Sequence, residues 1–202
     1  MQNPNAVCPI GFAYKHLAVR DIVNSSFQSA GQRCSALRVL YVQEDTSDII
    51  LNMLYGAMDE LVIGAPWNFS TDVGPVIDAT AKKQIGDYIA AAKADGRVLK
   101  MQDVPEVGHF IPPTVIKVNG INDLEREVFG PVLHVATFKA DELDKVVADI
   151  NNSGYGLTFG LHTRIDDRVE AITTKLNVGN MYINRNQIGA VVGSQPFGGE
   201  GM

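Results

Sequence analysis

Apolar residues recur at two spacings along this chain, and each spacing predicts a different kind of element. A spacing of three to four residues is typical of helices with one buried face, and it predicts helices that begin near Val19, Asp45, Asp78, Leu143 and Val169. Short apolar runs predict buried strands over residues 38–42, 97–100, 114–118, 132–138, 157–163 and 180–184. Because helices alternate with apolar strands, we expect an α/β fold with three layers, a largely parallel sheet and helices on both of its faces.

The first 18 residues carry neither spacing, and we leave residues 1–18 unassigned. Pro9 and Gly11 interrupt any regular element there. Residues 19–202 show no internal repeat, low-complexity run or linker, and their number is sufficient for one sizeable core, so we expect a single domain over this range. Within it, the first helix is expected to run through Ala30 and to end at Gly31.

Charge and composition argue against several classes of function. The net charge is −6 and no basic stripe is present to neutralise phosphates, so nucleic-acid binding is not expected. No apolar run approaches the roughly 18 residues of a membrane span, and the N-terminus carries no secretory signal. The two cysteines make no disulfide framework, which favours the cytoplasm. The four histidines lack metal-ligand spacing, so no metal is expected.

Cys34 is the candidate nucleophile. It follows Gly31-Gln32 at the end of the first predicted helix, and a turn presents a thiol to a substrate better than a packed helix face does. Gly31 allows backbone angles that other residues resist, and backbone N–H groups of such a turn can face a developing oxyanion. The alternative is a small buried side chain, which is the commoner role of a lone cysteine.

Three stretches, in order along most of the chain, resemble the signatures of the aldehyde dehydrogenase superfamily. They are residues 27–34 (Phe-x-x-x-Gly-Gln-x-Cys), 127–131 (Glu-Val-Phe-Gly-Pro) and 196–199 (Pro-Phe-Gly-Gly). The resemblance implies that the Cys34 thiolate attacks an aldehyde and that NAD accepts a hydride. It further implies that Glu127 binds the nicotinamide ribose and that Phe129 helps to hold the cofactor. Without the resemblance, Glu127 is expected to be a surface carboxylate in a charged run.

A narrower resemblance concerns the substrate. Residues 33–35 (Arg-Cys-Ser) and 187–192 (Gln-Ile-Gly-Ala-Val-Val) are similar to the glutamate-semialdehyde dehydrogenase branch, which is the 1-pyrroline-5-carboxylate dehydrogenase of proline catabolism. The run Gly-Gln-Arg-Cys-Ser-Ala-Leu-Arg is most similar to the bacterial bifunctional proline utilization A group. The implied substrate is therefore a small amino-acid aldehyde.

The same branch implies a set of substrate-binding residues. Ser35, Gly189 and Ala190 are expected to anchor the substrate α-carboxylate, and Phe197 is expected to pack on the aliphatic part of the substrate. Arg33 is expected to add positive potential near the carboxylate or to lower the pKa of the thiol, with an outward-pointing side chain as the alternative.

The resemblance covers residues 19–202, which correspond to a catalytic domain alone. The family's cofactor domain, oxyanion asparagine and general-base glutamate have no counterpart in this sequence, so the isolated chain is expected to be inactive. A homo-oligomer is implied, and FAD is expected only if a proline dehydrogenase half exists elsewhere in a parent protein. Two alternatives stay open: an aldehyde dehydrogenase of other specificity, and a non-catalytic scaffold with an inert thiol.

Overall fold

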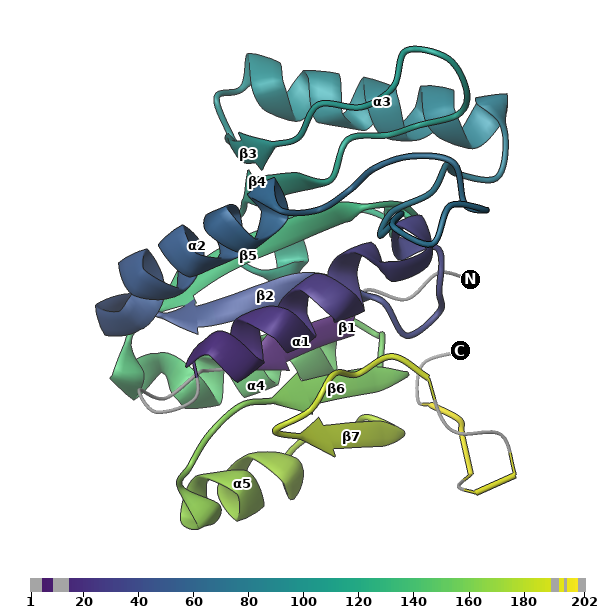
Figure 1. The fold of residues 1–202 in the computed structure, drawn as a ribbon. Helices are drawn as coiled ribbons and strands as arrows, with labels where there is room; N and C mark the ends of the chain where they lie inside the picture. The colour runs from purple at the N-terminus through teal and green to yellow at the C-terminus, as the bar shows by residue number, and fades with distance from the viewer. Residues whose placement is uncertain (1–4, 9–14, 190–192, 195, 200–202) are drawn as a thin grey trace.

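A seven-stranded sheet forms the centre of the computed structural model (Figure 1). The structure describes residues 5–8, 15–189, 193–194 and 196–199. The strands are β1 (Asn5–Cys8), β2 (Leu37–Gln43), β3 (Val98–Met101), β4 (Thr114–Lys117), β5 (Val132–Phe138), β6 (Thr158–Leu161) and β7 (Asn180–Ile183). They lie in the order β3-β4-β5-β2-β1-β6-β7, and every pair is parallel except the edge pair β3–β4. The predicted largely parallel sheet is confirmed.

Helices cover both faces of the sheet, as the sequence predicts. They are α1 (Lys15–Phe27), α2 (Glu44–Asp59), α3 (Ala79–Ala94), α4 (Leu143–Asn152) and α5 (Asp166–Thr173). In Figure 1, α1 and α2 lie in front of the sheet, whereas α4 lies behind it. Three short 3-10 turns, Gln28–Gly31, Ile121–Asp123 and Ala140–Glu142, join these elements.

β2 shows how the three layers are built. Leu40 and Val42 pack with the apolar side chains of α1, α2 and α3, while Val39 and Tyr41 pack with those of α4 and α5. Successive side chains of a strand point to opposite faces of the sheet, so the unbroken apolar run over residues 39–42 is buried on both sides. The continuous apolar run in the sequence therefore marks a central strand between two helical layers.

Two features of the N-terminal region differ from the sequence prediction. Asn5–Cys8, in the segment that we left unassigned, forms β1 and pairs in parallel with both β2 and β6. The first helix begins at Lys15 and ends at Phe27, because Ser29 and Ala30 adopt positive φ angles of 56° and 53°. The prediction of a helix through Ala30 is therefore wrong. The boundary of the catalytic domain at residue 19 stays a prediction.

Candidate active site

Cys34 lies in a tight turn between the end of α1 and the start of β2. The backbone N–H of Ala36 donates to the carbonyl of Arg33 at 3.0 Å, which closes the turn around Cys34 and Ser35. Cys34 is exposed, whereas Ser35 and the residues that follow it are buried. The alternative of a buried thiol is therefore wrong for this position. The turn presents a sulfur to the surface directly beside the core, which is the placement that a nucleophile requires.

A left-handed segment leads into this turn. Ser29, Ala30 and Gly31 all have φ between 53° and 65°, a region of backbone conformation that residues other than glycine rarely adopt. A Cβ on Gly31 would lie 2.2 Å from the carbonyl oxygen of Gly130. Glycine is thus required at position 31 for two reasons, its φ angle and the close approach of the Gly130 backbone.

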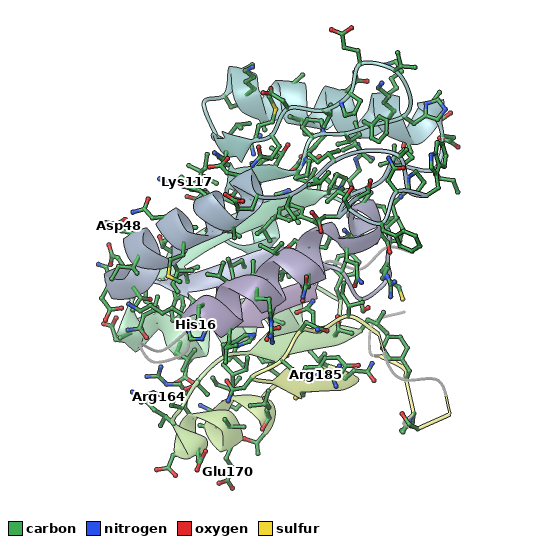
Figure 2. The ribbon with its side chains drawn as sticks, in the orientation of Figure 1. His16, Asp48, Lys117, Arg164, Glu170 and Arg185 are labelled. Carbon is green, nitrogen blue, oxygen red and sulfur yellow. The ribbon has the colours of Figure 1, made fainter. Side chains whose placement is uncertain are left out.

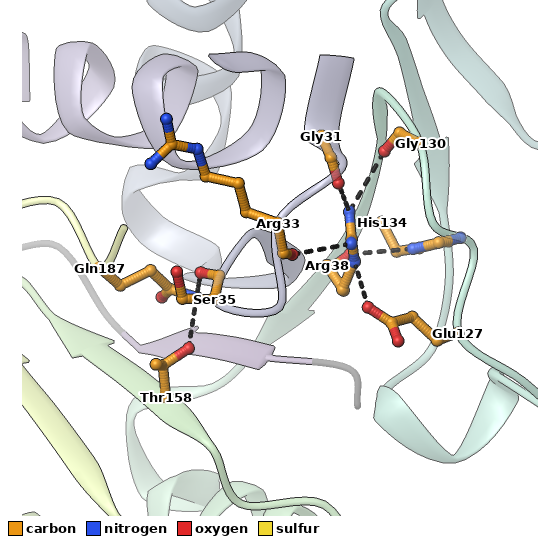
Figure 3. A network of polar contacts seen from close by, with 9 residues as sticks. All are labelled: Gly31, Arg33, Ser35, Arg38, Glu127, Gly130, His134, Thr158 and Gln187. Carbon is orange, nitrogen blue, oxygen red and sulfur yellow. Dashed lines mark hydrogen bonds and ion pairs between the residues drawn. The ribbon is translucent and has the colours of Figure 1, made fainter. Parts of the chain in front are cut away.

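Arg38 joins the turn to the loop that precedes β5 (Figure 3). Its Nη1 donates to the carbonyls of Gly31 at 2.6 Å and Gly130 at 3.2 Å, and its Nη2 donates to the carbonyl of Arg33 at 3.2 Å. Its Nε donates to Oε1 of Glu127 at 2.9 Å. The Arg38 side chain, which belongs to β2, is fully buried. Burial lowers the pKa of the Arg38 guanidinium, and the adjacent Glu127 carboxylate acts in the opposite direction.

Glu127 and Phe129, the predicted cofactor residues, lie on this loop. Glu127 is only 4% exposed, so its interpretation as a surface carboxylate is wrong. The Phe129 ring lies 4.8 Å from the Arg38 guanidinium carbon and is itself 40% exposed. Both residues line a pocket of about 120 Å³, together with Gln32 and Ile77 among others. The loop thus places a buried carboxylate and an aromatic ring at the wall of one small pocket.

His134 supports Arg38 from the neighbouring strand, β5. Its Nδ1 lies 2.9 Å from the carbonyl oxygen of Arg38, and its Nε2 lies 2.8 Å from the hydroxyl of Tyr88. Because a carbonyl oxygen only accepts hydrogen bonds, Nδ1 carries the proton and the Tyr88 hydroxyl donates to Nε2. Burial lowers the pKa of His134 to about 4. The ring is therefore neutral near pH 7 and serves as a fixed hydrogen-bonding bridge.

The predicted carboxylate-binding residues meet on the other side of the turn. The backbone N–H of Gly189 donates to Oγ of Ser35 at 3.0 Å, although 154 residues separate them in the sequence. Nη1 of Arg33 lies 4.0 Å from the place where a Cβ on Gly189 would stand, and Nε of Arg33 donates to Oγ of Ser29 at 3.1 Å. The structure thus brings Arg33, Ser35 and Gly189 together in one corner, in which Arg33 is exposed and Ser35 is buried.

Gln187 fixes the Gly189 segment against this corner. Its side-chain Nε2 lies 3.3 Å from the carbonyl oxygen of Ser35 and 3.4 Å from the hydroxyl of Thr158 (Figure 3). Its backbone N–H donates to Oγ of Ser25 at 3.2 Å. The side chain is 1% exposed. The sequence alone predicts no role for Gln187, since a single glutamine within a glycine-rich stretch gives no signal of burial.

The last predicted stretch is held against β7. The Asn180 side chain donates to the carbonyl of Gly198, and a Cβ on Gly199 would lie 2.7 Å from Cα of Leu157. Phe197, between these contacts and the turn at residues 193–194, is 40% exposed. Its packing on a substrate stays a prediction. Ala190 lies outside the described residues, so its predicted role stays a prediction as well.

Charged and histidine side chains elsewhere gather in no metal-binding arrangement in the part of the chain that the structure describes. Figure 2 shows how His16, Asp48, Lys117, Arg164, Glu170 and Arg185 are spread over the molecule. In the same described ranges, no helix has the length and apolar character that crossing a membrane requires.

Comparison with known proteins identifies the class to which this fold and site belong. The sequence profile described as "Aldehyde dehydrogenase family" matches residues 3–202. The chain belongs to the aldehyde dehydrogenase family. The match includes most of the segment that we left unassigned, in which β1 lies.

Two curated relatives and two solved structures are more specific. The chain is 50% identical over 206 residues to "Bifunctional protein PutA" of Klebsiella aerogenes, covering 98% of the chain and 16% of that protein. It is 38% identical to "1-pyrroline-5-carboxylate dehydrogenase" of Bacillus cereus, covering 92% of the chain and 36% of the relative. The chain thus spans a minor part of the length of these relatives.

The structural matches agree with the sequence matches. A crystal structure of bifunctional proline utilization A superposes with a TM-score of 0.95 at 47% identity, covering all of this chain and 20% of that one. A 1-pyrroline-5-carboxylate dehydrogenase from Thermus with bound NAD superposes with a TM-score of 0.89 at 31% identity, covering 98% of this chain and 39% of that one. Both matches place the sheet and its helices within the fold of this enzyme branch.

Proposed function

We propose that this chain is the catalytic-domain part of an NAD-dependent L-glutamate γ-semialdehyde dehydrogenase, which oxidises the aldehyde to glutamate in proline catabolism. The observation that carries the proposal is the Ser35–Gly189 hydrogen bond next to the exposed thiol of Cys34. A polar corner with Arg33 beside it suits a substrate with a carboxylate at one end and an aldehyde at the other. The relatives named PutA and 1-pyrroline-5-carboxylate dehydrogenase support the same substrate.

Cys34 carries the chemistry in this proposal. Attack of its thiolate on the aldehyde carbon forms a carbon–sulfur bond and places negative charge on the former carbonyl oxygen, for which the backbone N–H of Cys34 is the assigned donor. NAD, when bound, supplies the acceptor for the hydride that this carbon then loses, which leaves a thioester on Cys34. Water cleaves the thioester, releases the acid and restores the thiol.

The residues at the pocket wall fit the nicotinamide end of this cofactor. Glu127 provides carboxylate oxygens, which are the acceptors that ribose hydroxyls require. Phe129 provides a partly exposed aromatic face beside the same pocket. We therefore assign the ribose contact to Glu127 and the apolar contact to Phe129. FAD belongs to this proposal only through a proline dehydrogenase half elsewhere in a parent protein.

Replacement of Cys34 tests the proposal directly. In the complete enzyme that carries this domain, Cys34→Ala is expected to abolish NADH formation from glutamate semialdehyde and NAD. A drop of at least about 10³-fold is the size expected when a covalent nucleophile is lost. Ser70→Ala, at an exposed loop position, is the control for expression and folding, and it should retain activity. Retained NADH formation by the Cys34 variant would refute the assignment.

Two further expectations belong to the same proposal. The 202-residue chain by itself is expected to give no measurable NADH, and robust NAD reduction by it would contradict this. A cytoplasmic homo-oligomer is proposed for the parent protein. Large exposed apolar side chains, Trp67, Phe69, Ile77 and Val107, support an assembly in which other protein surface covers them.

A further inference from the structure

We propose that Arg38 is a positioning residue that fixes the Cys34 turn relative to the Glu127–Gly130 loop, an inference that rests on the proposed function. Its guanidinium donates to the carbonyls of Gly31 and Arg33, on the turn, and to the carbonyl of Gly130 and the carboxylate of Glu127, on the loop. One side chain thus connects the segment that carries the nucleophile with the segment assigned to the cofactor.

The chemistry of arginine suits this task. Its five N–H groups lie in a rigid plane, so bonds made by Nε, Nη1 and Nη2 fix the mutual positions of all their acceptors. The ammonium group of lysine has three donors on one atom at the end of a flexible chain. It therefore cannot bond at once to acceptors on both the turn and the loop. The four bonds of Arg38, at 2.6 to 3.2 Å, therefore hold two backbone segments in one geometry.

The same guanidinium also contacts the aromatic ring on the cofactor side. Its central carbon lies 4.8 Å from the centre of the Phe129 ring, within the range of a cation–π contact. Phe129 and Glu127 both line the small pocket. Arg38 itself is fully buried, so it acts on the pocket through these two side chains and is not a catalytic residue.

Arg38 is in turn held by the centre of the sheet. It belongs to β2, whose next residue, Val39, pairs with His134 of β5. The His134 ring accepts a hydrogen bond from Tyr88 and donates to the Arg38 carbonyl. The sheet fixes the Arg38 backbone, and the four hydrogen bonds of the guanidinium fork fix the Cys34 turn and the Glu127–Gly130 loop. The distance from the thiol to the cofactor pocket is therefore set by the core. Loss of the fork should disturb both ends together.

The test uses the complete enzyme with Arg38→Lys, which keeps the charge and loses the fork. We expect kcat to fall about 10- to 100-fold, as for small displacements of reacting groups, and the dissociation constant for NAD, measured by calorimetry, to rise several-fold. Arg164→Lys, at an exposed position, is the matched control and should change neither. Unchanged kcat and NAD affinity with only a lower melting temperature, or a change in just one of the two, would overturn the proposal.

A second comparison keeps the proposal testable if the lysine variant folds poorly. Arg38→Met with Glu127→Gln removes both buried charges and leaves no unpaired carboxylate. Compared with Glu127→Gln alone, the double variant should have a kcat at least about 10-fold lower and a weaker NAD affinity, because the bonds to the turn, the bond to Gly130 and the contact with Phe129 are additionally lost. Equal kcat values would overturn the proposal. The Cys34→Ala result bears on the proposed function independently of both outcomes.

Discussion

Ser35 is the residue at which nucleophile and substrate-binding corner meet. It follows Cys34 directly, and its hydroxyl accepts a hydrogen bond from the Gly189 backbone at 3.0 Å. The side chain is 2% exposed, so its hydroxyl is fixed by this bond rather than by water. In our proposal, the substrate carboxylate accepts hydrogen bonds at this corner, and the aldehyde at the other end of the substrate then lies near the thiol.

Replacement of Ser35 by alanine should change the choice of substrate more than the chemistry. In the complete enzyme, Ser35→Ala is expected to raise KM for glutamate semialdehyde about 10- to 150-fold, since loss of one hydrogen bond to a charged group is worth roughly 1.5–3 kcal/mol. Activity on short aliphatic aldehydes, which have no α-carboxylate, should change little. Steady-state kinetics with both aldehydes measure this. An equal loss on both substrates would contradict the assignment of Ser35.

At the same scale, the sequence predicted some residues of the candidate site and gave no indication of others. Cys34, Ser35 and Gly189 are proposed from their motifs, and the structure brings the last two into contact. Arg38 was missed because its partner Glu127 lies 89 residues further along the chain. A signal was present, since a charged residue inside an otherwise apolar strand must find a partner when it is buried. His134 is interpreted from the sequence as an ordinary strand residue, because its partners Tyr88 and Arg38 lie 46 and 96 residues away.

At the scale of elements, the helix-to-strand connection before β2 sets the position of the thiol. Three successive residues, Ser29 to Gly31, adopt the left-handed conformation, and the Gly130 backbone packs against the last of them. The sequence predicted most helices and strands correctly, since their apolar spacing reflects burial in the two layers. It could not predict this segment, because serine and alanine carry no mark of a positive φ and the contact with Gly130 is remote in sequence.

Gly31 and Gly96 allow the contribution of this contact to be measured. Both have similar φ angles, 65° and 69°, but a Cβ on Gly96 would meet nothing within 4 Å. Gly96→Ala should therefore cost only the left-handed strain of about 1–2 kcal/mol. Gly31→Ala should cost at least about 2 kcal/mol more, because a backbone carbonyl must move. Urea unfolding gives both values. Equal destabilisation by the two variants would contradict the close approach at Gly31.

At the scale of the whole molecule, two buried histidines make the stability of the fold depend on pH. Burial lowers the pKa of His134 to about 4, and burial also lowers the pKa of His162, which Asp21 partly offsets. A histidine with a depressed pKa stabilises the fold fully above its unfolded value of about 6.5, because the unfolded chain binds the proton more readily. This stability is lost as the pH falls from about 6.5 toward 4.

A pH series of unfolding measurements tests the contribution of His134. A difference of about 2.5 pKa units corresponds to about 3 kcal/mol of unfolding free energy lost between pH 7 and pH 4. His134→Gln does not titrate, so it should lose clearly less stability over this interval than the unmodified protein. Ser70→Ala, at an exposed loop position, is the control and should leave the pH dependence unchanged. A His134 variant with the full original pH dependence would contradict the buried neutral ring.

Mass spectrometry of the acylated enzyme is the most direct test of the account as a whole. The complete enzyme is mixed with glutamate semialdehyde and NAD, quenched in acid during turnover, and digested for peptide mapping. A glutamyl thioester is predicted on the peptide that contains Cys34, and Ser35→Ala should reduce its yield at low substrate concentration. An acyl group on Cys8 or on any other residue, with Cys34 unmodified, would contradict the claim that this turn carries the nucleophile.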